Sequence, residues 1–123
     1  MSPVAIVPIR SFRLGKSRLA PHMSEDERHA LARALADRVT EAAAAAGLSP
    51  LVVTSDPEVA QWAAAAGLPV VPDPGGGLDA ACRSGVVAAG DRRWVVIHSD
   101  LPLIVAADLR TVADEMAAGR DVI

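Results

Sequence analysis

The chain of 123 residues is poor in several features, and each shortage excludes a class of protein. It has a single cysteine, Cys82, so no internal disulfide can form, which agrees with a reducing cytoplasm. No apolar stretch approaches the length of a membrane-spanning helix, and the start does not have the pattern of a signal peptide. The net charge of −3 argues against a protein that coats nucleic acid. We therefore expect a cytoplasmic protein that neither spans a membrane nor binds nucleic acid.

Aromatic side chains are also scarce, because Phe12, Trp62 and Trp94 are the only Phe, Trp or Tyr residues. We expect Trp62 to pack a helix against the sheet and Trp94 to open a strand. The three histidines lack the spacing of metal ligands, and His98 is expected to be packed within a strand. Cys82 is interpreted as a core thiol. No Ser-His-Asp or Cys-His set can be assembled, so nucleophilic catalysis by the chain is not expected.

Lysine is reduced to one residue, Lys16, and it lies in a basic cluster. Arg10, Arg13, Lys16 and Arg18 are a third of the 12 basic residues and lie within nine positions. In an acidic protein such a cluster indicates one localised anionic ligand. A solvated basic loop is the alternative interpretation.

Short apolar strands alternate with longer Ala-rich helical segments, which predicts an α/β fold with a mostly parallel sheet and right-handed crossovers. Ser24 and Glu27 form a capping box for the first helix, and Asp56 followed by Pro57 caps the second. Strands are expected at 4–8, 51–54, 69–72, 94–98 and 121–123, and helices at 24–46, from 57, at 78–89 and at 106–118. The length fits one domain over 1–123.

In open sheets of this kind, ligands bind beyond the carboxyl ends of the strands. The loops at 9–18, 54–56, 73–79 and 99–102 are therefore the ones to search. Gly15-Lys16-Ser17 invites comparison with a Walker loop, but Arg10 stands where that loop needs a glycine, and Pro21 interrupts the start of a helix. The loop is better read as a flexible basic segment that wraps and neutralises a triphosphate.

Asp100 follows the most apolar strand of the sequence and precedes Leu101-Pro102. A carboxylate at the end of a buried strand is poorly hydrated, and a cation stabilises it. Mg²⁺ fits, because it binds one or two carboxylates together with substrate phosphates. The alternative is that Asp100 caps the turn into Pro102.

The run Gly75-Gly76-Gly77, followed by Asp79, lets the backbone approach a ligand at the start of a helix. It lacks the spacing of a dinucleotide fingerprint, and a simple connecting turn is the alternative. The stretch Thr54-Ser55-Asp56 is a candidate for contact with a base or ribose, although Asp56 equally caps its helix.

Taken in chain order, these loops resemble one family, 2-phospho-L-lactate guanylyltransferase, whose actinobacterial members act as phosphoenolpyruvate guanylyltransferase. The resemblance spans the whole chain and is carried by Val7-Pro8-Ile9-Arg10, Gly15-Lys16-Ser17-Arg18-Leu19, Val53-Thr54-Ser55-Asp56, Gly77-Leu78-Asp79-Ala80-Ala81 and His98-Ser99-Asp100-Leu101-Pro102-Leu103.

The resemblance implies a three-layer nucleotidyltransferase fold of the glycosyltransferase-A type and a role in making coenzyme F-420. The implied substrates are GTP and either phosphoenolpyruvate or 2-phospho-L-lactate, and the implied metal is Mg²⁺. Lys16 and Arg18 would act on the triphosphate and Asp100 would bind the metal. Nucleotide contacts would come from Arg10, Ser17, Thr54, Asp56, Gly76, Gly77 and Asp79.

Three departures from the family pattern stand out. Arg10 stands where lysine is expected, and Asp79 where asparagine is expected. Family members also continue past 121–123 into a segment that supplies most of the acceptor site. We therefore expect a truncated form that holds the nucleotide-binding half, and an uncovered sheet would favour a homodimer.

Three other functions remain open at this stage. The first is another nucleotidyltransferase of the same fold, of the molybdopterin guanylyltransferase or cytidylyltransferase type. The second is a non-catalytic nucleotide-binding remnant that has lost its acceptor half. The third, a P-loop kinase, is disfavoured by Arg10.

Overall fold

The structure, a computed structural model, describes residues 3–12 and 24–98, and within them strands and helices alternate along the chain. The strands are β1 (Val4–Pro8), β2 (Ser49–Val53), β3 (Val70–Val71) and β4 (Trp94–Val96). The helices are α1 (Glu25–Ala45), α2 (Pro57–Ala65) and α3 (Leu78–Ala89). The helix at 106–118 and the strand at 121–123 lie outside the described residues.

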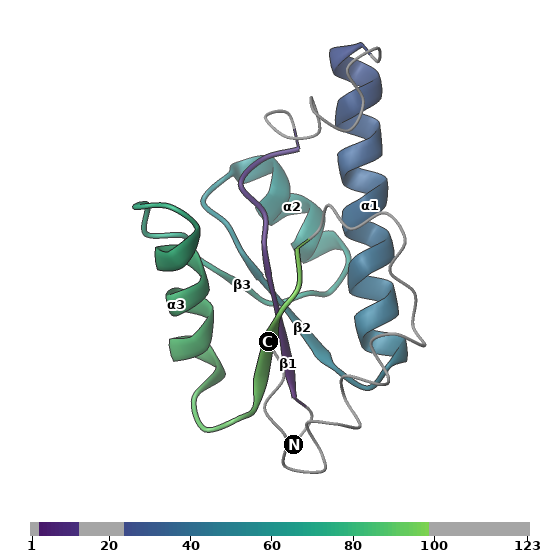
Figure 1. The fold of residues 1–123 in the computed structure, drawn as a ribbon. Helices are drawn as coiled ribbons and strands as arrows, with labels where there is room; N and C mark the ends of the chain where they lie inside the picture. Colours follow the sequence, from purple (N-terminus) through teal and green to yellow (C-terminus); the bar gives the residue numbers. More distant parts are fainter. Residues whose placement is uncertain (1–2, 13–23, 99–123) are drawn as a thin grey trace.

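The four described strands form one sheet in the order β3-β2-β1-β4, and every pair is parallel. Val4 of β1 is opposite Ser49 on one side and Trp94 on the other, so β1 lies between β2 and β4. The carboxyl ends of the strands therefore meet at one edge of the sheet (Figure 1). This confirms the predicted parallel α/β architecture.

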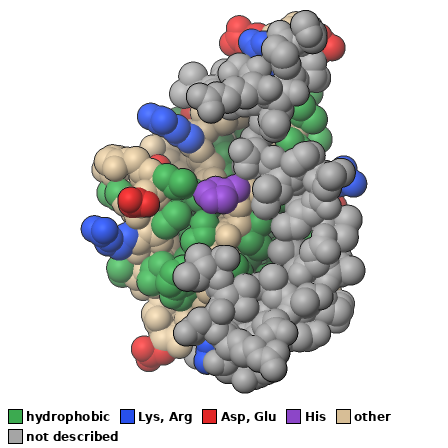
Figure 2. Space-filling model, viewed as in Figure 1, with side chains coloured by type: hydrophobic (Ala, Val, Ile, Leu, Met, Phe, Trp, Pro, Cys, Tyr) green, Lys and Arg blue, Asp and Glu red, His purple; other side chains and the backbone are tan. Residues whose placement is uncertain are grey.

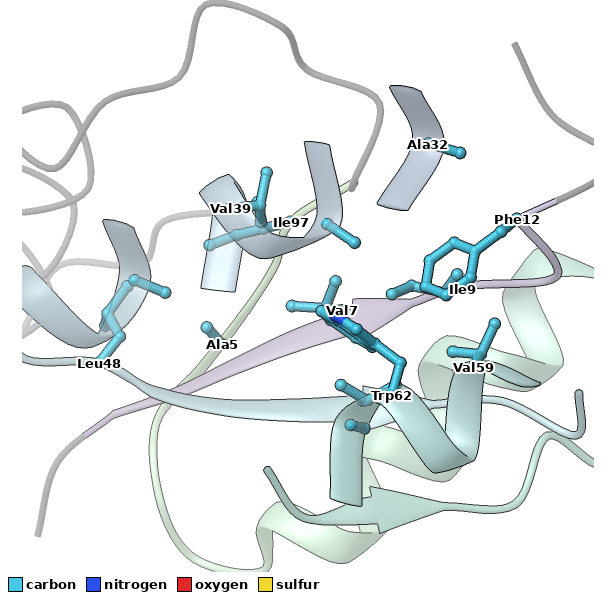
Figure 3. Packing of buried hydrophobic residues seen from close by; sticks show 14 of the residues in the cluster. Ala5, Val7, Ile9, Phe12, Ala32, Val39, Leu48, Val59, Trp62 and Ile97 are labelled. Atoms are coloured by element: carbon cyan, nitrogen blue, oxygen red, sulfur yellow. The ribbon is translucent and has the colours of Figure 1, made fainter. Parts of the chain in front are cut away.

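Helices cover both faces of the sheet, as expected for strands that are apolar throughout. Ala5, Val7 and Ile9 face a core built with α1 and α2, part of which Figure 3 shows. Val4 and Ile6 face a smaller core that includes Ala81 and Ala89 of α3. The molecule thus has three layers, with α1 and α2 on one side and α3 on the other (Figure 1).

Both predicted helix caps are present. The Glu27 N–H donates to Ser24 Oγ at 3.1 Å, and the Ser24 N–H donates to Glu27 Oε1 at 2.9 Å. The backbone hydrogen bond from Ser24 lowers the pKa of the Glu27 carboxyl, with a smaller effect of the Ser24 side chain. At α2 the Val59 N–H donates to Asp56 Oδ2 at 3.0 Å. None of the helices in residues 3–12 and 24–98 is long and apolar enough to cross a membrane.

Strand β2 begins two residues earlier than predicted and includes Pro50. The N–H groups of Val52 and Thr54 donate toward β3, so the Pro50 nitrogen, two residues before Val52, points the same way. Because β3 pairs only with Val52 and Val53, no strand among the described residues lies opposite Pro50 on that side. A proline is tolerated there since no ladder hydrogen bond is lost.

Strand β4 is shorter than predicted. It ends at Val96, although the Ile97 N–H still donates to the Ile6 carbonyl at 2.9 Å. His98 lies beyond this last hydrogen bond and is exposed, so the prediction that it is packed within a strand is wrong.

Helix α3 approaches β1 closely because residue 85 is glycine. A Cβ atom built on Gly85 would lie 2.5 Å from Cγ2 of Ile6, a separation that Cβ atoms do not adopt. Ile6 is fully buried, so its side chain has nowhere to move. The short distance between helix and strand thus depends on the missing side chain.

We expect Gly85→Ala to lower the free energy of unfolding by about 1–3 kcal/mol, the usual cost of overpacking. This runs against the intrinsic preference of helices for alanine over glycine, worth about 1 kcal/mol. Urea denaturation followed by circular dichroism would measure it.

The double variant Gly85→Ala/Ile6→Ala serves as the control, because it removes the clashing atoms. It should lose less stability than the sum of the two single variants. If Gly85→Ala were as stable as the wild type, α3 could move away from β1 without loss of free energy, and the expectation would be wrong.

Candidate functional site

A pocket of about 320 Å³ lies at the carboxyl edge of the sheet, where the fold rule for parallel sheets places ligands. Its lining residues come from the end of β1, the loop after β2 and the turn between β3 and α3. It is lined by Pro8, Ile9, Arg10, Ser55, Asp73, Gly75, Gly76, Gly77, Leu78 and Ala81. Three segments far apart in the sequence therefore contribute to one hollow.

The glycine turn forms one side of this pocket. Gly75, Gly76 and Gly77 have φ of +83°, +92° and +97°, a region that side-chain-bearing residues rarely adopt. Asp73 stabilises the turn, since the Gly75 N–H donates to its Oδ1 at 2.9 Å. Gly77 precedes α3 without a side-chain cap, so no cap side chain covers the first amides of the helix. Of the predicted contact residues, Gly76 and Gly77 line the pocket.

Arg10 forms the opposite side. It follows Ile9, the residue directly after β1, whose N–H still donates to the Val53 carbonyl at 3.0 Å. Arg10 is exposed and lines the pocket, and its contact with an anion stays a prediction. The lining of the pocket therefore includes a cationic side chain as well as the backbone at the start of α3.

Thr54 and Asp56 lie next to the pocket but do not line it. Thr54 is buried, and its hydroxyl accepts the Asp56 N–H at 3.1 Å while its carbonyl accepts the Asp73 N–H at 3.2 Å. Asp56 caps α2. The residue between them, Ser55, is exposed and lines the pocket. Of the predicted stretch 54–56, only Ser55 is thus among the lining residues, and a nucleotide contact of Thr54 or Asp56 stays a prediction.

Asp79 is exposed in the first turn of α3 and is not among the lining residues. Asp79 lies one turn before Cys82, and its charge acts on the Cys82 thiol. Burial raises the pKa of the Cys82 thiol, and the Asp79 carboxylate raises it further. Cys82 is half-buried, so it is less enclosed than the predicted core thiol, and it stays a neutral thiol at neutral pH.

Four of the predicted site residues, Lys16, Ser17, Arg18 and Asp100, lie outside the described residues. Within residues 3–12 and 24–98, no three His, Cys, Asp or Glu side chains gather in a way that would hold a metal ion. The assignment of Mg²⁺ to Asp100 thus stays a prediction.

A second hollow, of about 520 Å³, lies on the other side of the glycine turn. It is lined by Val71, Pro74, Gly75, Ala80, Arg83, Ser84, Val87 and Ala88. Arg83 is its one charged lining residue, and the Ser84 hydroxyl already donates to the Pro72 carbonyl. Hydrophobic side chains also lie at the surface between charged ones on the side of the molecule that carries α3 (Figure 2). This hollow lacks the paired donors and acceptors of the first one, which is therefore the candidate nucleotide site.

Comparison with known proteins agrees with this geometry. Residues 3–123 match the family model for guanylyl transferase CofC-like proteins. Phosphoenolpyruvate guanylyltransferase from Sphaerobacter thermophilus is 34% identical over 114 residues, which are 89% of this chain and 55% of that protein. 2-Phospho-L-lactate guanylyltransferase from Methanothermobacter thermautotrophicus is 32% identical over 128 residues, covering 100% of this chain and 56% of the relative.

A third relative is named for a different acceptor. 3-Phospho-D-glycerate guanylyltransferase from Phenylobacterium zucineum is 37% identical over 114 residues, which are 85% of this chain and 52% of the relative. The chain thus spans about half the length of the curated relatives it matches.

Among solved structures, a proposed nucleotide-diphospho-sugar transferase from Desulfovibrio desulfuricans G20 superimposes with a TM-score of 0.78 at 16% identity. The match covers 95% of this chain and 55% of the other, and it confirms the predicted three-layer nucleotidyltransferase fold. With a family model that matches nearly every residue and relatives above 30% identity, the chain belongs to the guanylyl transferase CofC-like family.

Proposed function

We propose that this chain provides the nucleotide-binding part of a guanylyltransferase, which transfers GMP from GTP to a phosphorylated three-carbon acid and releases pyrophosphate. The observation that carries the proposal is the pocket between Arg10 and the glycine turn at the carboxyl edge of the sheet. The named activities of the relatives support it, since all three are guanylyltransferases.

The pocket is large enough for part of a nucleotide, because small-ligand sites are usually about 300–1,000 Å³. It also offers both kinds of polar partner. The Asp73 carboxylate accepts hydrogen bonds, and Arg10, the Ser55 hydroxyl and the amides at the start of α3 donate them. Guanine presents N–H donors next to a carbonyl acceptor, so a carboxylate beside donors discriminates it from adenine.

Within this proposal, Asp73 binds the donor edge of guanine and Arg10 neutralises phosphate charge. Arginine matches phosphate geometry with a planar fork of N–H groups, so its presence in place of lysine favours a fixed, two-point contact. Lys16 and Arg18, in the same loop, would stabilise the charge that moves onto the departing pyrophosphate.

The reaction needs no covalent intermediate with the protein. The acceptor phosphate is a nucleophile at neutral pH, so the protein has to hold it in line with the α-phosphorus of GTP. Mg²⁺, held by Asp100, would supply further charge neutralisation at the phosphates. The described residues of the pocket therefore act by binding and orienting the nucleotide.

The acceptor is a three-carbon phosphoacid, and three such acids occur in the names of the relatives: phosphoenolpyruvate, 2-phospho-L-lactate and 3-phospho-D-glycerate. We propose phosphoenolpyruvate or 2-phospho-L-lactate as the acceptor, in coenzyme F-420 biosynthesis. The third acid is the competing acceptor that an assay has to include.

We expect the longest protein that the gene encodes to release pyrophosphate from GTP only when one of these acids is present. A coupled pyrophosphate assay with Mg²⁺, run with each acid in turn, measures this. Assays of the 123-residue chain alone would show whether this part suffices. The proposal fails if the longer protein is folded but neither binds GTP nor releases pyrophosphate with any acid.

We expect Asp73→Asn to weaken GTP binding about tenfold or more, because the amide cannot accept both guanine donors. Asparagine keeps a carbonyl oxygen for the Gly75 N–H, so the turn should survive. Binding of ATP should change little, and isothermal titration with both nucleotides measures the difference.

Asp91→Asn is the matched control, since Asp91 is an exposed carboxylate in the turn between α3 and β4, at the opposite edge of the sheet. It removes the same charge and should leave GTP affinity unchanged. Equal losses in both variants would mean that net charge, and not a base contact, sets the affinity.

A further inference from the structure

The segment after β1 has buried and exposed residues in a pattern that fixes its direction. Ile9 is 4% exposed and Phe12 is 1% exposed, and both belong to the core beneath α1 and α2. Arg10, between them, is exposed and lines the pocket. The buried side chains of Ile9 and Phe12 therefore lie before and after Arg10 in the sequence, and they point into the core while Arg10 lines the pocket.

Phe12 is held in an aromatic clamp, which we define as Phe12, His29 and Trp62. The Phe12 ring meets the Trp62 ring of α2 edge to face, with centroids 5.5 Å apart and planes at 87°. It meets the His29 ring of α1 in the same way, at 6.1 Å and 86°. Figure 3 shows Phe12 beside Ile9 at the end of the core, with Trp62 below the strand. Such edge-to-face pairs contribute beyond the apolar area that they bury.

Polar contacts hold both rings that pack against Phe12, those of Trp62 and His29. The Trp62 Nε1–H donates to Asp37 Oδ1 at 2.7 Å, which ties α2 to α1. His29 Nε2 lies 2.6 Å from Glu58 Oε2, which ties α1 to the first turn of α2. An apolar residue at position 29 would fill the space without this second tie. The orientation of both rings around Phe12 is therefore set by contacts between the two helices.

We propose that Phe12 is a positioning residue that fixes Arg10 at the edge of the pocket, with His29 and Trp62 as its support. This inference rests on the proposed function, because the pocket that Arg10 lines is the proposed GTP site. Ile9 holds the backbone directly before Arg10, and Phe12 holds it two residues after Arg10. With buried side chains on both sides, the backbone at Arg10 is less free to turn away from the pocket. Ordering a long cationic side chain before the ligand arrives lowers the entropy cost of binding.

The first test needs no nucleotide. Trypsin cleaves after Arg10 only when this segment leaves the core, so local cleavage reports its anchoring. In the full-length protein, the ratio of cleavage after Arg10 to cleavage after Arg83, within α3, separates local release from global unfolding. Mass spectrometry of the released fragments measures both. We expect the ratio to rise about tenfold in Phe12→Ala, in line with the lost anchor, and less in Phe12→Leu.

Val39→Ala is the matched control, since Val39 is a fully buried side chain of the same core that does not belong to the segment or the clamp. It should lower the unfolding temperature but leave the cleavage ratio unchanged. His29→Leu keeps an apolar group against Phe12 and removes the contact with Glu58, so it should raise the ratio by a smaller factor than Phe12→Ala.

The second test measures the dissociation constant for GTP in the same variants, well below their unfolding temperatures. Phe12→Ala should bind GTP about tenfold more weakly, a loss typical of a misplaced binding group, while Val39→Ala should bind as the wild type does. Arg10→Ala should lose affinity as well, and adding Phe12→Ala to it should cost little more, because the two residues act as a unit.

The outcomes separate the two proposals. An unchanged cleavage ratio in Phe12→Ala overturns the positioning role, whatever the GTP affinity. A raised ratio with equal GTP affinity in Phe12→Ala and the wild type also overturns it. A raised ratio in a protein whose wild type fails to bind GTP supports the anchoring of Arg10 and overturns the proposed function.

Discussion

The structure depends on one constraint, the parallel pairing of β1 with both β2 and β4. A strand paired on both sides and covered on both faces has to be apolar throughout, and Val4, Ala5, Ile6 and Val7 are all buried. Parallel pairing also brings the carboxyl ends of the strands to one edge, so every chain reversal at that edge is a candidate for ligand binding. The position of the pocket follows from this pairing, before any side chain of the pocket is considered.

The two faces of the sheet contribute differently to that edge. On one face, Gly85 lets α3 lie close to Ile6, and the start of the same helix carries the glycine turn to the pocket. On the other face, the clamp around Phe12 holds the segment that carries Arg10. The pocket forms at the end of β1, where the glycine turn and the segment that carries Arg10 both line it. The glycine turn supplies backbone groups, and the segment supplies the cationic side chain of Arg10.

Local signals in the sequence predicted local structure well. The capping box at Ser24 and the cap at Asp56 each depend on residues three positions apart, and α3 begins directly after Gly77 and ends directly before Gly90. Features that depend on distant partners were missed. Pro50 enters β2 because β3 is too short to reach it, and His98 is exposed because the pairing of β4 with β1 has ended. The sequence indicated the stretch 54–56 but not which of its residues lines the pocket: Ser55 does, because the Thr54 hydroxyl accepts the Asp56 N–H and the Asp56 carboxylate caps α2. The residue types of a loop indicate that it binds something, but only the packing decides which side chains remain available.

The different kinds of residue in the pocket bear on how the proposed guanylyl transfer would combine specificity with rate. In the proposed reaction the acceptor phosphate is the nucleophile, so no side chain has to form a bond with the substrate, and the rate would depend on charge and alignment. Asp73 and Ser55 are short side chains on rigid turns, suited to recognising an edge of a base. Arg10 is long and would be a poor fixed charge unless something restrained the backbone beneath it. The buried ring of Phe12, two residues away, provides that restraint from the opposite side of the chain. In the proposed function, the packing of α1 on α2 is thereby coupled to the charge that would meet the phosphates.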